Sequence, residues 1–198
     1  MAFGVLVGVG SGALISIRLG QQKRDEAEQI LGNAFTLILI IAVIVSGACL
    51  FFLDPLLKSF GASAEVLPYA REFIRIILWG SIFQYLSFGL SNIIRAEGNP
   101  RTAMIALLIN AALNIILGSI FVYFLGYGIK GTAVATVISQ AVSAAWVLAH
   151  FRSKNSVLRL RFKHLGLKWN LLKGILAIGM APFSIQMAAS VVNIFFNQ

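Results

Sequence analysis

The sequence contains few charged residues. Asp, Glu, Lys and Arg make up 12% of its 198 residues, whereas hydrophobic residues make up 59%, and its mean hydropathy is +0.88. A soluble domain is about a quarter charged and about half apolar, so this composition excludes one. Because the apolar residues form long runs rather than an alternating pattern, the sequence predicts an all-α, polytopic membrane bundle and not a membrane β-barrel.

Cysteine is almost absent, and the residues that build metal or catalytic sites are scattered. Cys49 is the single cysteine, which excludes an internal disulfide and most metal frameworks. His150 and His164 each fall at a membrane boundary beside basic residues and have no partner ligands, so we interpret both as interfacial residues. There is no phosphate loop, nucleophile elbow or zinc spacing. The sequence therefore predicts neither an enzyme nor a bound cofactor.

Acidic residues are also scarce within the apolar runs. All seven fall in loops or at helix ends, namely Asp25, Glu26, Glu28, Asp54, Glu65, Glu72 and Glu97. A proton or sodium relay in a membrane usually needs a carboxylate inside the bilayer. The sequence places none in the middle of a span.

The apolar runs are long enough for six membrane spans, since about 20 apolar residues cross a bilayer core. The predicted spans are Met1–Ile17, Ile30–Leu53, Tyr69–Ile94, Thr102–Tyr127, Gly131–Phe151 and Asn170–Gln198. The second is the most uniformly apolar, and we expect it to lie largely against lipid. The first carries small residues four apart, which predicts close approach of another helix; they are Gly4, Gly8, Gly12 and Ser16. Met1 opens directly into this run, so no signal peptide is predicted.

The positive charges gather in alternate connections. The net charge is +9, and segments 18–29, 95–101 and 152–173 hold three, two and seven basic residues. By the positive-inside rule these segments are cytoplasmic. For the basic connection 152–173, its position between two spans favours anionic lipid headgroups over nucleic acid as its partner.

Polar side chains recur at helical spacing inside several spans. Asn110 and Asn114 lie one turn apart in the middle of the fourth span, and Gly118 lies one turn further. Such groups either join helices, at roughly 0.6 kcal/mol per hydrogen bond, or line a hydrated cavity. Several stripes together favour the cavity. The predicted substrate- and cation-binding residues are Gln84, Asn110, Asn114, Thr136, Ser139, Gln140 and Gln186.

Four segments resemble one transporter family, and they occur in its order along the whole chain. They read RLGQQKRDEAEQILGNAF, IRAEGNPRTAMI, LNIILGSIF and GIKGTAVATVISQ. The chain thus resembles the multidrug and toxic compound extrusion (MATE) transporters, in particular their bacterial multidrug-export branch. This resemblance implies a twelve-helix antiporter in the bacterial inner membrane. Such a protein has two six-helix lobes and exports cationic amphiphilic drugs or dyes in exchange for Na⁺ or H⁺.

The resemblance also implies a division of the chain, which would cover helices two to seven. Residues 1–151 would form the first-lobe bundle, 152–170 the basic cytoplasmic linker between lobes, and 171–198 the first helix of the second lobe. The first helix and most of the second lobe would be missing partners of the fold. Because alternating access needs two lobes that rock against each other, we expect that this chain alone does not transport.

The family's cation site can be carried over in part. It uses an aspartate on helix one, an Asn–Asp pair on helix five and a threonine on helix six. Asn114 matches the asparagine and Thr136 the threonine, but Gly118 stands where the second aspartate is usual. Neither carboxylate is present, which puts ion coupling through this site in question. The alternatives are a flippase for lipid-linked glycans from the same superfamily and a non-transporting membrane fragment or scaffold.

Overall fold

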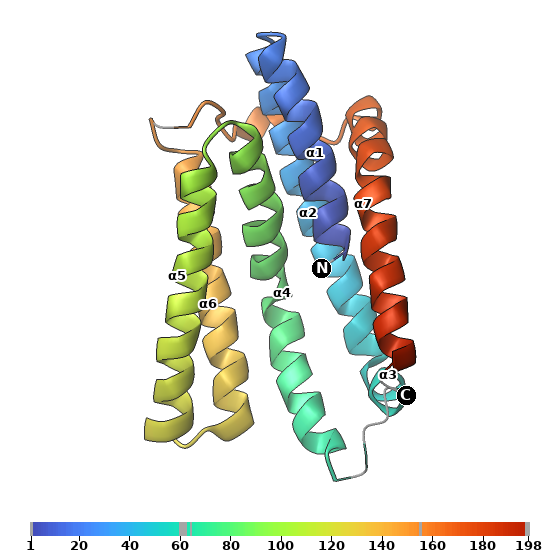
Figure 1. Ribbon diagram of the computed structural model, residues 1–198, viewed down its shortest axis with the longest axis vertical. Helices are drawn as coiled ribbons and strands as arrows, with labels where there is room; N and C mark the ends of the chain where they lie inside the picture. Colours follow the sequence, from blue (N-terminus) through green and yellow to red (C-terminus); the bar gives the residue numbers. More distant parts are fainter. Residues whose placement is uncertain (1, 60–62, 64, 155, 197–198) are drawn as a thin grey trace.

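The computed structural model describes residues 2–59, 63, 65–154 and 156–196, and all regular secondary structure in them is helical. The long helices lie side by side (Figure 1). They are α1 (Ala2–Gly20), α2 (Arg24–Phe51), α4 (Leu67–Ala96), α5 (Pro100–Ser119), α6 (Gly128–His150) and α7 (Trp169–Phe196). A π-helical turn, η1 (Ile120–Phe124), extends α5, and a 3₁₀ turn, η2 (Phe162–His164), precedes α7. Within the described residues six helices are long and apolar enough to cross a membrane, which confirms the predicted helical bundle.

Local chemistry explains where these helices begin. The α2 helix starts at Arg24, before the apolar run, because the polar residues there include Asp25 and Glu26, which favour a helix N-terminus. At α5 the Asn99 side chain caps the helix by accepting a hydrogen bond from the Thr102 amide at 3.2 Å, and Pro100 occupies the first turn. A short helix that the sequence did not predict, α3 (Leu53–Ser59), follows α2.

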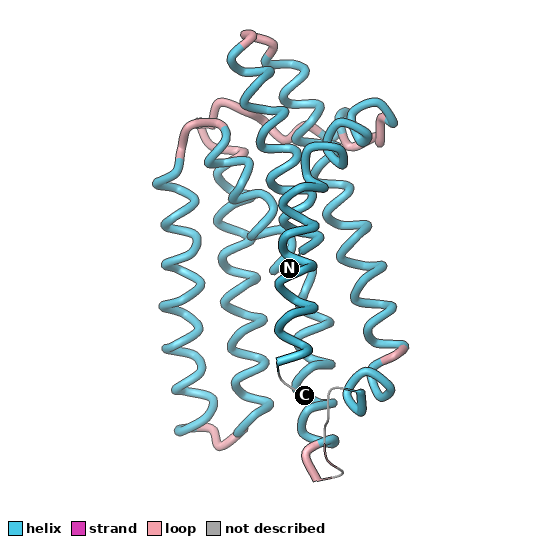
Figure 2. Tube along the Cα trace, turned by 45° about the vertical axis from the view of Figure 1, so that its right-hand side comes forward, coloured by secondary structure: helices cyan, strands magenta, loops and turns pink. Residues whose placement is uncertain are grey.

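The connections lie at the two ends of the bundle (Figure 2). The turn after α1, the turn after α4 and the segment between α6 and α7 share one end, at the top of Figure 1. These are the three basic segments, so this is the cytoplasmic end by the positive-inside rule. At the opposite end lie α3 and the turn between η1 and α6.

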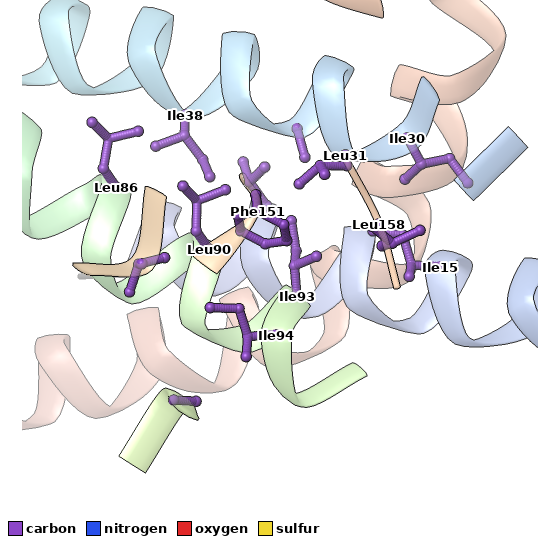
Figure 3. Close-up of a cluster of buried hydrophobic side chains, with 14 of the residues drawn as sticks. Ile15, Ile30, Leu31, Ile38, Leu86, Leu90, Ile93, Ile94, Phe151 and Leu158 are labelled. Atoms are coloured by element: carbon purple, nitrogen blue, oxygen red, sulfur yellow. The ribbon is translucent and has the colours of Figure 1, made fainter. Parts of the chain in front are cut away.

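The small-residue stripe of α1 packs directly on α4, as predicted. A β-carbon added to Gly8 would lie 3.0 Å from the Gly89 carbonyl oxygen, tighter than an ordinary van der Waals contact, so the small residue lets the two backbones lie this close. One end of the stripe is fixed by Ser16, whose hydroxyl donates to the Ala96 carbonyl oxygen at 3.1 Å. Beside this contact the apolar core gathers side chains from α1, α2, α4 and the end of α6 (Figure 3).

Burial along α2 changes sharply at its middle. Its cytoplasmic half is buried, and Leu31 and Ile38 belong to the core, whereas Val43 and Ile44 in the outer half are each 63% exposed. The expectation that this span lies against lipid therefore suits its outer half and is wrong for its cytoplasmic half. There, the helix packs on the core and on the segment before α7.

The helices form two groups. One contains α4, α5 and α6; the other contains α1, α2 and α7, and α1 and α2 also pack on α4. The α7 helix rests on α1 and, less extensively, on α2, and in the described chain it makes no contact with α5 or α6. Side chains on α7 are thus separated from the α5–α6 pair.

Candidate functional site

A hydrogen bond between two side chains joins the helices of the α5–α6 pair, from Asn114 to Thr136. The Asn114 side-chain amide donates to the Thr136 hydroxyl at 2.9 Å, and that hydroxyl donates to the Thr132 carbonyl oxygen, also at 2.9 Å. Both Asn114 and Thr136 are half-buried. The two residues that the sequence singled out for polar or cation contact are therefore neighbours, although they are 22 positions apart.

Open space lies one turn further along α5. In the described part of the chain, a β-carbon added to Gly118 would meet no atom outside its own helix within 4 Å. Since Asn114 and Gly118 are four residues apart, they lie on the same face of α5. This face therefore has room for a larger side chain next to the Asn114–Thr136 contact.

The other predicted residues of the α4–α6 group are buried to different degrees. Ser139 is fully buried, and its hydroxyl donates to the Ala135 carbonyl oxygen of its own helix at 2.7 Å. Gln140 is 8% exposed, and its side-chain oxygen has no hydrogen-bond partner among the residues that the structure describes. Gln84 on α4 and Asn110 on α5 are half-buried. Because the Ser139 hydroxyl finds its hydrogen-bond partner within its own helix, this residue fits a role in helix packing better than one in lining a hydrated cavity.

Gln186 lies elsewhere. It is exposed on α7, on the far side of the bundle from α5 and α6 (Figure 1). The structure therefore brings Asn114 and Thr136 together but does not bring Gln186 to them. A pocket of about 310 Å³ lies between the outer halves of α2 and α4, where the Ser46 and Ser81 hydroxyls hydrogen-bond, and none of the predicted site residues lines it.

The sequence reading missed two buried carboxylates at the cytoplasmic end. Glu28 and Glu97 do fall at helix ends, as expected, but their side chains are each only 1% exposed. His150, interpreted as an interfacial residue, is instead buried and hydrogen-bonds Glu97. The sequence did contain a signal for this burial. The start of α2 carries a face of polar and small residues in an otherwise apolar helix, made of Glu28, Gly32, Asn33 and Thr36. Within the described residues no cluster of His, Cys, Asp and Glu could hold a metal ion.

The model of the MatE family matches residues 1–120, which is more than half of the chain. The chain belongs to the MatE family. It is 30% identical over 197 residues to the multidrug export protein MepA of Staphylococcus haemolyticus (strain JCSC1435), covering 100% of this chain and 44% of that protein.

Solved structures of the family have the same helix arrangement. The chain matches an inward-facing multidrug resistance MATE transporter of the MOP superfamily with a TM-score of 0.92 and 29% identity, over 98% of this chain and 44% of the other. It matches an outward-facing structure with a TM-score of 0.90 and 29% identity, over 98% and 43%. The chain thus spans less than half the length of the relatives it matches.

Membership in the MatE family confirms several sequence predictions. The chain is part of a transporter fold and not an enzyme, and it is a multi-pass protein of the bacterial plasma membrane. Its coverage of the relatives agrees with one near-complete lobe of a larger transporter. The remaining helices of that fold are not in this chain.

Proposed function

We propose that this chain forms most of the first lobe, the linker and the first second-lobe helix of a multidrug export antiporter. The complete protein would export cationic amphiphilic compounds in exchange for H⁺ or Na⁺ by alternating access. The observation that carries this proposal is the alignment of the whole chain with a relative named as a multidrug export protein. Similarity to both an inward-facing and an outward-facing transporter supports it, since one helix arrangement suits both states.

In this proposal the Asn114–Thr136 contact is the polar part of the substrate or cation pathway. An amide and a hydroxyl supply donors and acceptors at bilayer depth without a fixed charge, which suits contact with a cation whose charge is partly shielded by water. The open face at Gly118 leaves space beside them. Because no carboxylate lies there, any coupling ion would need a further ligand from the missing helices.

A chimera tests the function. Residues 1–198 replace the matching part of the Staphylococcus haemolyticus relative, and the chimera is expressed in cells that lack their own efflux pumps. We expect efflux of a cationic dye that stops when the ion gradients are collapsed. A chimera that is inserted at normal levels but exports no cationic dye would contradict the proposal, and movement of an anionic lipid-linked glycan instead would favour the flippase alternative.

The site has its own test in the same chimera. Asn114→Ala removes the donor to Thr136, and we expect lower dye efflux at unchanged expression. The control is Ser184→Ala, because the Ser184 hydroxyl is exposed and donates only to the Met180 carbonyl oxygen of its own helix, at 2.9 Å. Unchanged efflux in Asn114→Ala would remove this residue from the pathway.

A further inference from the structure

The segment between α6 and α7 is held tightly against the cytoplasmic end of the lobe. Two buried carboxylates, Glu97 and Glu28, belong to different helices, and both bind this one segment. Three sets of contacts hold this segment. They are hydrogen bonds to Glu97, contacts to Glu28, and contacts between the backbone of the segment and the next two turns of α2.

The first anchor is Glu97, at the end of α4. One of its oxygens pairs with His150, the last residue of α6. The other accepts from the Leu158 amide at 3.3 Å and lies 3.0 Å from the Ser156 hydroxyl, which also lies 2.6 Å from the Leu158 carbonyl oxygen. Leu158 is fully buried in the core. This buried carboxylate thus has three polar partners, and two of them, the Ser156 hydroxyl and the Leu158 amide, belong to the linker.

The second anchor is Glu28, in the first turns of α2. The Arg159 amide donates to one of its oxygens at 3.3 Å, and Nε of Arg161 lies 2.8 Å from the other. Arg24 of the same helix adds a more distant charge at 3.7 Å. A buried charge is costly unless it is paired and hydrogen-bonded, and here the linker supplies the nearest partners.

The contacts continue along the same face of α2 to the start of α7. The Thr36 hydroxyl donates to the Leu165 carbonyl oxygen at 2.8 Å, and Asn33 accepts from the Lys168 amide at 2.6 Å. At Gly32 the linker backbone lies so close that a β-carbon would meet the His164 carbonyl oxygen at 2.4 Å. Anchored positions thus run from Ser156 to Lys168, the residue directly before α7.

We propose that Glu97 and Glu28 are the anchors of a docking surface that holds the inter-lobe linker on the first lobe throughout transport. The linker would then move as part of this lobe, and the joint between lobes would begin at Trp169 rather than within the linker. Alignment over 98% of the chain with both an inward-facing and an outward-facing transporter supports one docked arrangement in both states. The docking itself does not depend on the proposed function, but its persistence during transport does.

Docking is tested by proteolysis of this chain in inside-out membrane vesicles, with cleavage after Arg159 and Arg161 measured by mass. Cleavage requires local release of the segment, so its rate reports the docked fraction. We expect Glu97→Gln and Glu28→Gln each to raise the rate on the order of ten- to hundredfold, the effect of losing a charge-assisted hydrogen bond. The control Glu26→Gln, which breaks exposed ion pairs with Arg18 and Lys23, should leave the rate unchanged.

If either buried carboxylate is needed for folding, the same proteolysis test can use variants that remove a single hydroxyl instead of a charge. Thr36→Val removes the hydroxyl that donates to the Leu165 carbonyl oxygen, and Ser156→Ala removes the hydroxyl that contacts both Glu97 and the Leu158 carbonyl oxygen. We expect several-fold faster cleavage from each. Equal cleavage rates in wild type and in these variants would overturn the docking surface.

Persistence during transport is tested by cross-linking in the chimera. Gln29 and Lys168 meet at their side-chain ends, 2.6 Å apart, so Gln29→Cys with Lys168→Cys in a Cys49→Ala background can be joined by a short bifunctional thiol reagent. We expect dye efflux to be unchanged by the cross-link. Loss of efflux on cross-linking, restored by reduction, would show that the linker must undock; absence of efflux before cross-linking would instead count against the proposed function.

Discussion

Gly10 of α1 and Gly179 of α7 lie where the two helix backbones approach each other so closely that neither site has room for a β-carbon. A β-carbon added to Gly179 would lie 2.0 Å from the Leu6 carbonyl oxygen, and one added to Gly10 would lie 2.1 Å from the Ile175 carbonyl oxygen. Both obstacles are backbone atoms, which cannot rotate away as a side chain can. Gly179→Ala should therefore push the two helices apart.

The size of the effect follows from the distances. Carbon and oxygen normally approach to about 3.3–3.6 Å, so the helices must separate by more than about 1 Å. Overpacking of this kind costs about 1–3 kcal/mol, and helix association in membranes depends mainly on close packing. Gly47→Ala is the matched control, because a β-carbon there meets nothing within 4 Å. The gain in helix propensity, about 1 kcal/mol, is shared by both variants and cancels.

The assay is reversible unfolding of the chain in mixed micelles at rising SDS fraction, followed by tryptophan fluorescence; Trp169 opens α7. We expect Gly179→Ala to be less stable than Gly47→Ala by about 1–3 kcal/mol. Equal stabilities would show that α1 and α7 are not held at this distance in the membrane protein, and the packing described for α7 would then be wrong.

Three further changes have definite expected outcomes. Ser143→Ala should lower the free energy of unfolding by about 1 kcal/mol in the same assay. The reason is that the buried Ser143 hydroxyl donates to the Ala106 carbonyl oxygen at 2.9 Å and hydrogen-bonds the Ser87 hydroxyl at 2.7 Å. An unchanged stability would mean that this contact does not join α4, α5 and α6. Glu72→Gln breaks an exposed ion pair with Lys130 at 2.9 Å and should lower the free energy of unfolding by less than about 1 kcal/mol. A larger loss of stability would show that this pair is not screened by solvent. Gly118→Asp should be accepted sterically and make efflux by the chimera depend more steeply on the Na⁺ or H⁺ gradient, whereas unchanged ion dependence would argue against a coupling site at this turn.

Hydropathy and small-residue spacing predicted the spans well, for physical reasons. Long apolar runs must be helical in a bilayer because every backbone group needs a partner within the segment. The stripe from Gly4 to Ser16 marked the α1 face that packs on α4, since only small residues permit that approach. Helix ends were less accurate. At α2 the polar residues before the apolar run continue the helix and do not form a loop.

The buried cytoplasmic contacts could not be predicted in the same way. Whether Glu97 is exposed depends on Ser156 and Leu158, which lie about 60 positions later in the chain. Glu28 meets Arg159, which lies 131 positions away. A span-by-span reading assigns both carboxylates to loop ends, because periodicity within one helix carries no information about a loop that folds back over it. The polar stripes singled out Asn114 and Thr136 on separate spans, and the resemblance to a family then paired the two positions.

One consequence concerns how much sequence change each helix can accept. Gly8 and Gly10 face opposite neighbours, α4 and α7, across a single helix. Saturation mutagenesis of α1 should therefore find that larger side chains are not tolerated at every second position around Gly8 and Gly10. Such a period of two is typical of a strand, although this segment is a helix. The α5 helix, with 6% of its most apolar stretch buried, should instead accept most apolar replacements at its exposed positions, with Asn110 and Asn114 of the candidate site as exceptions.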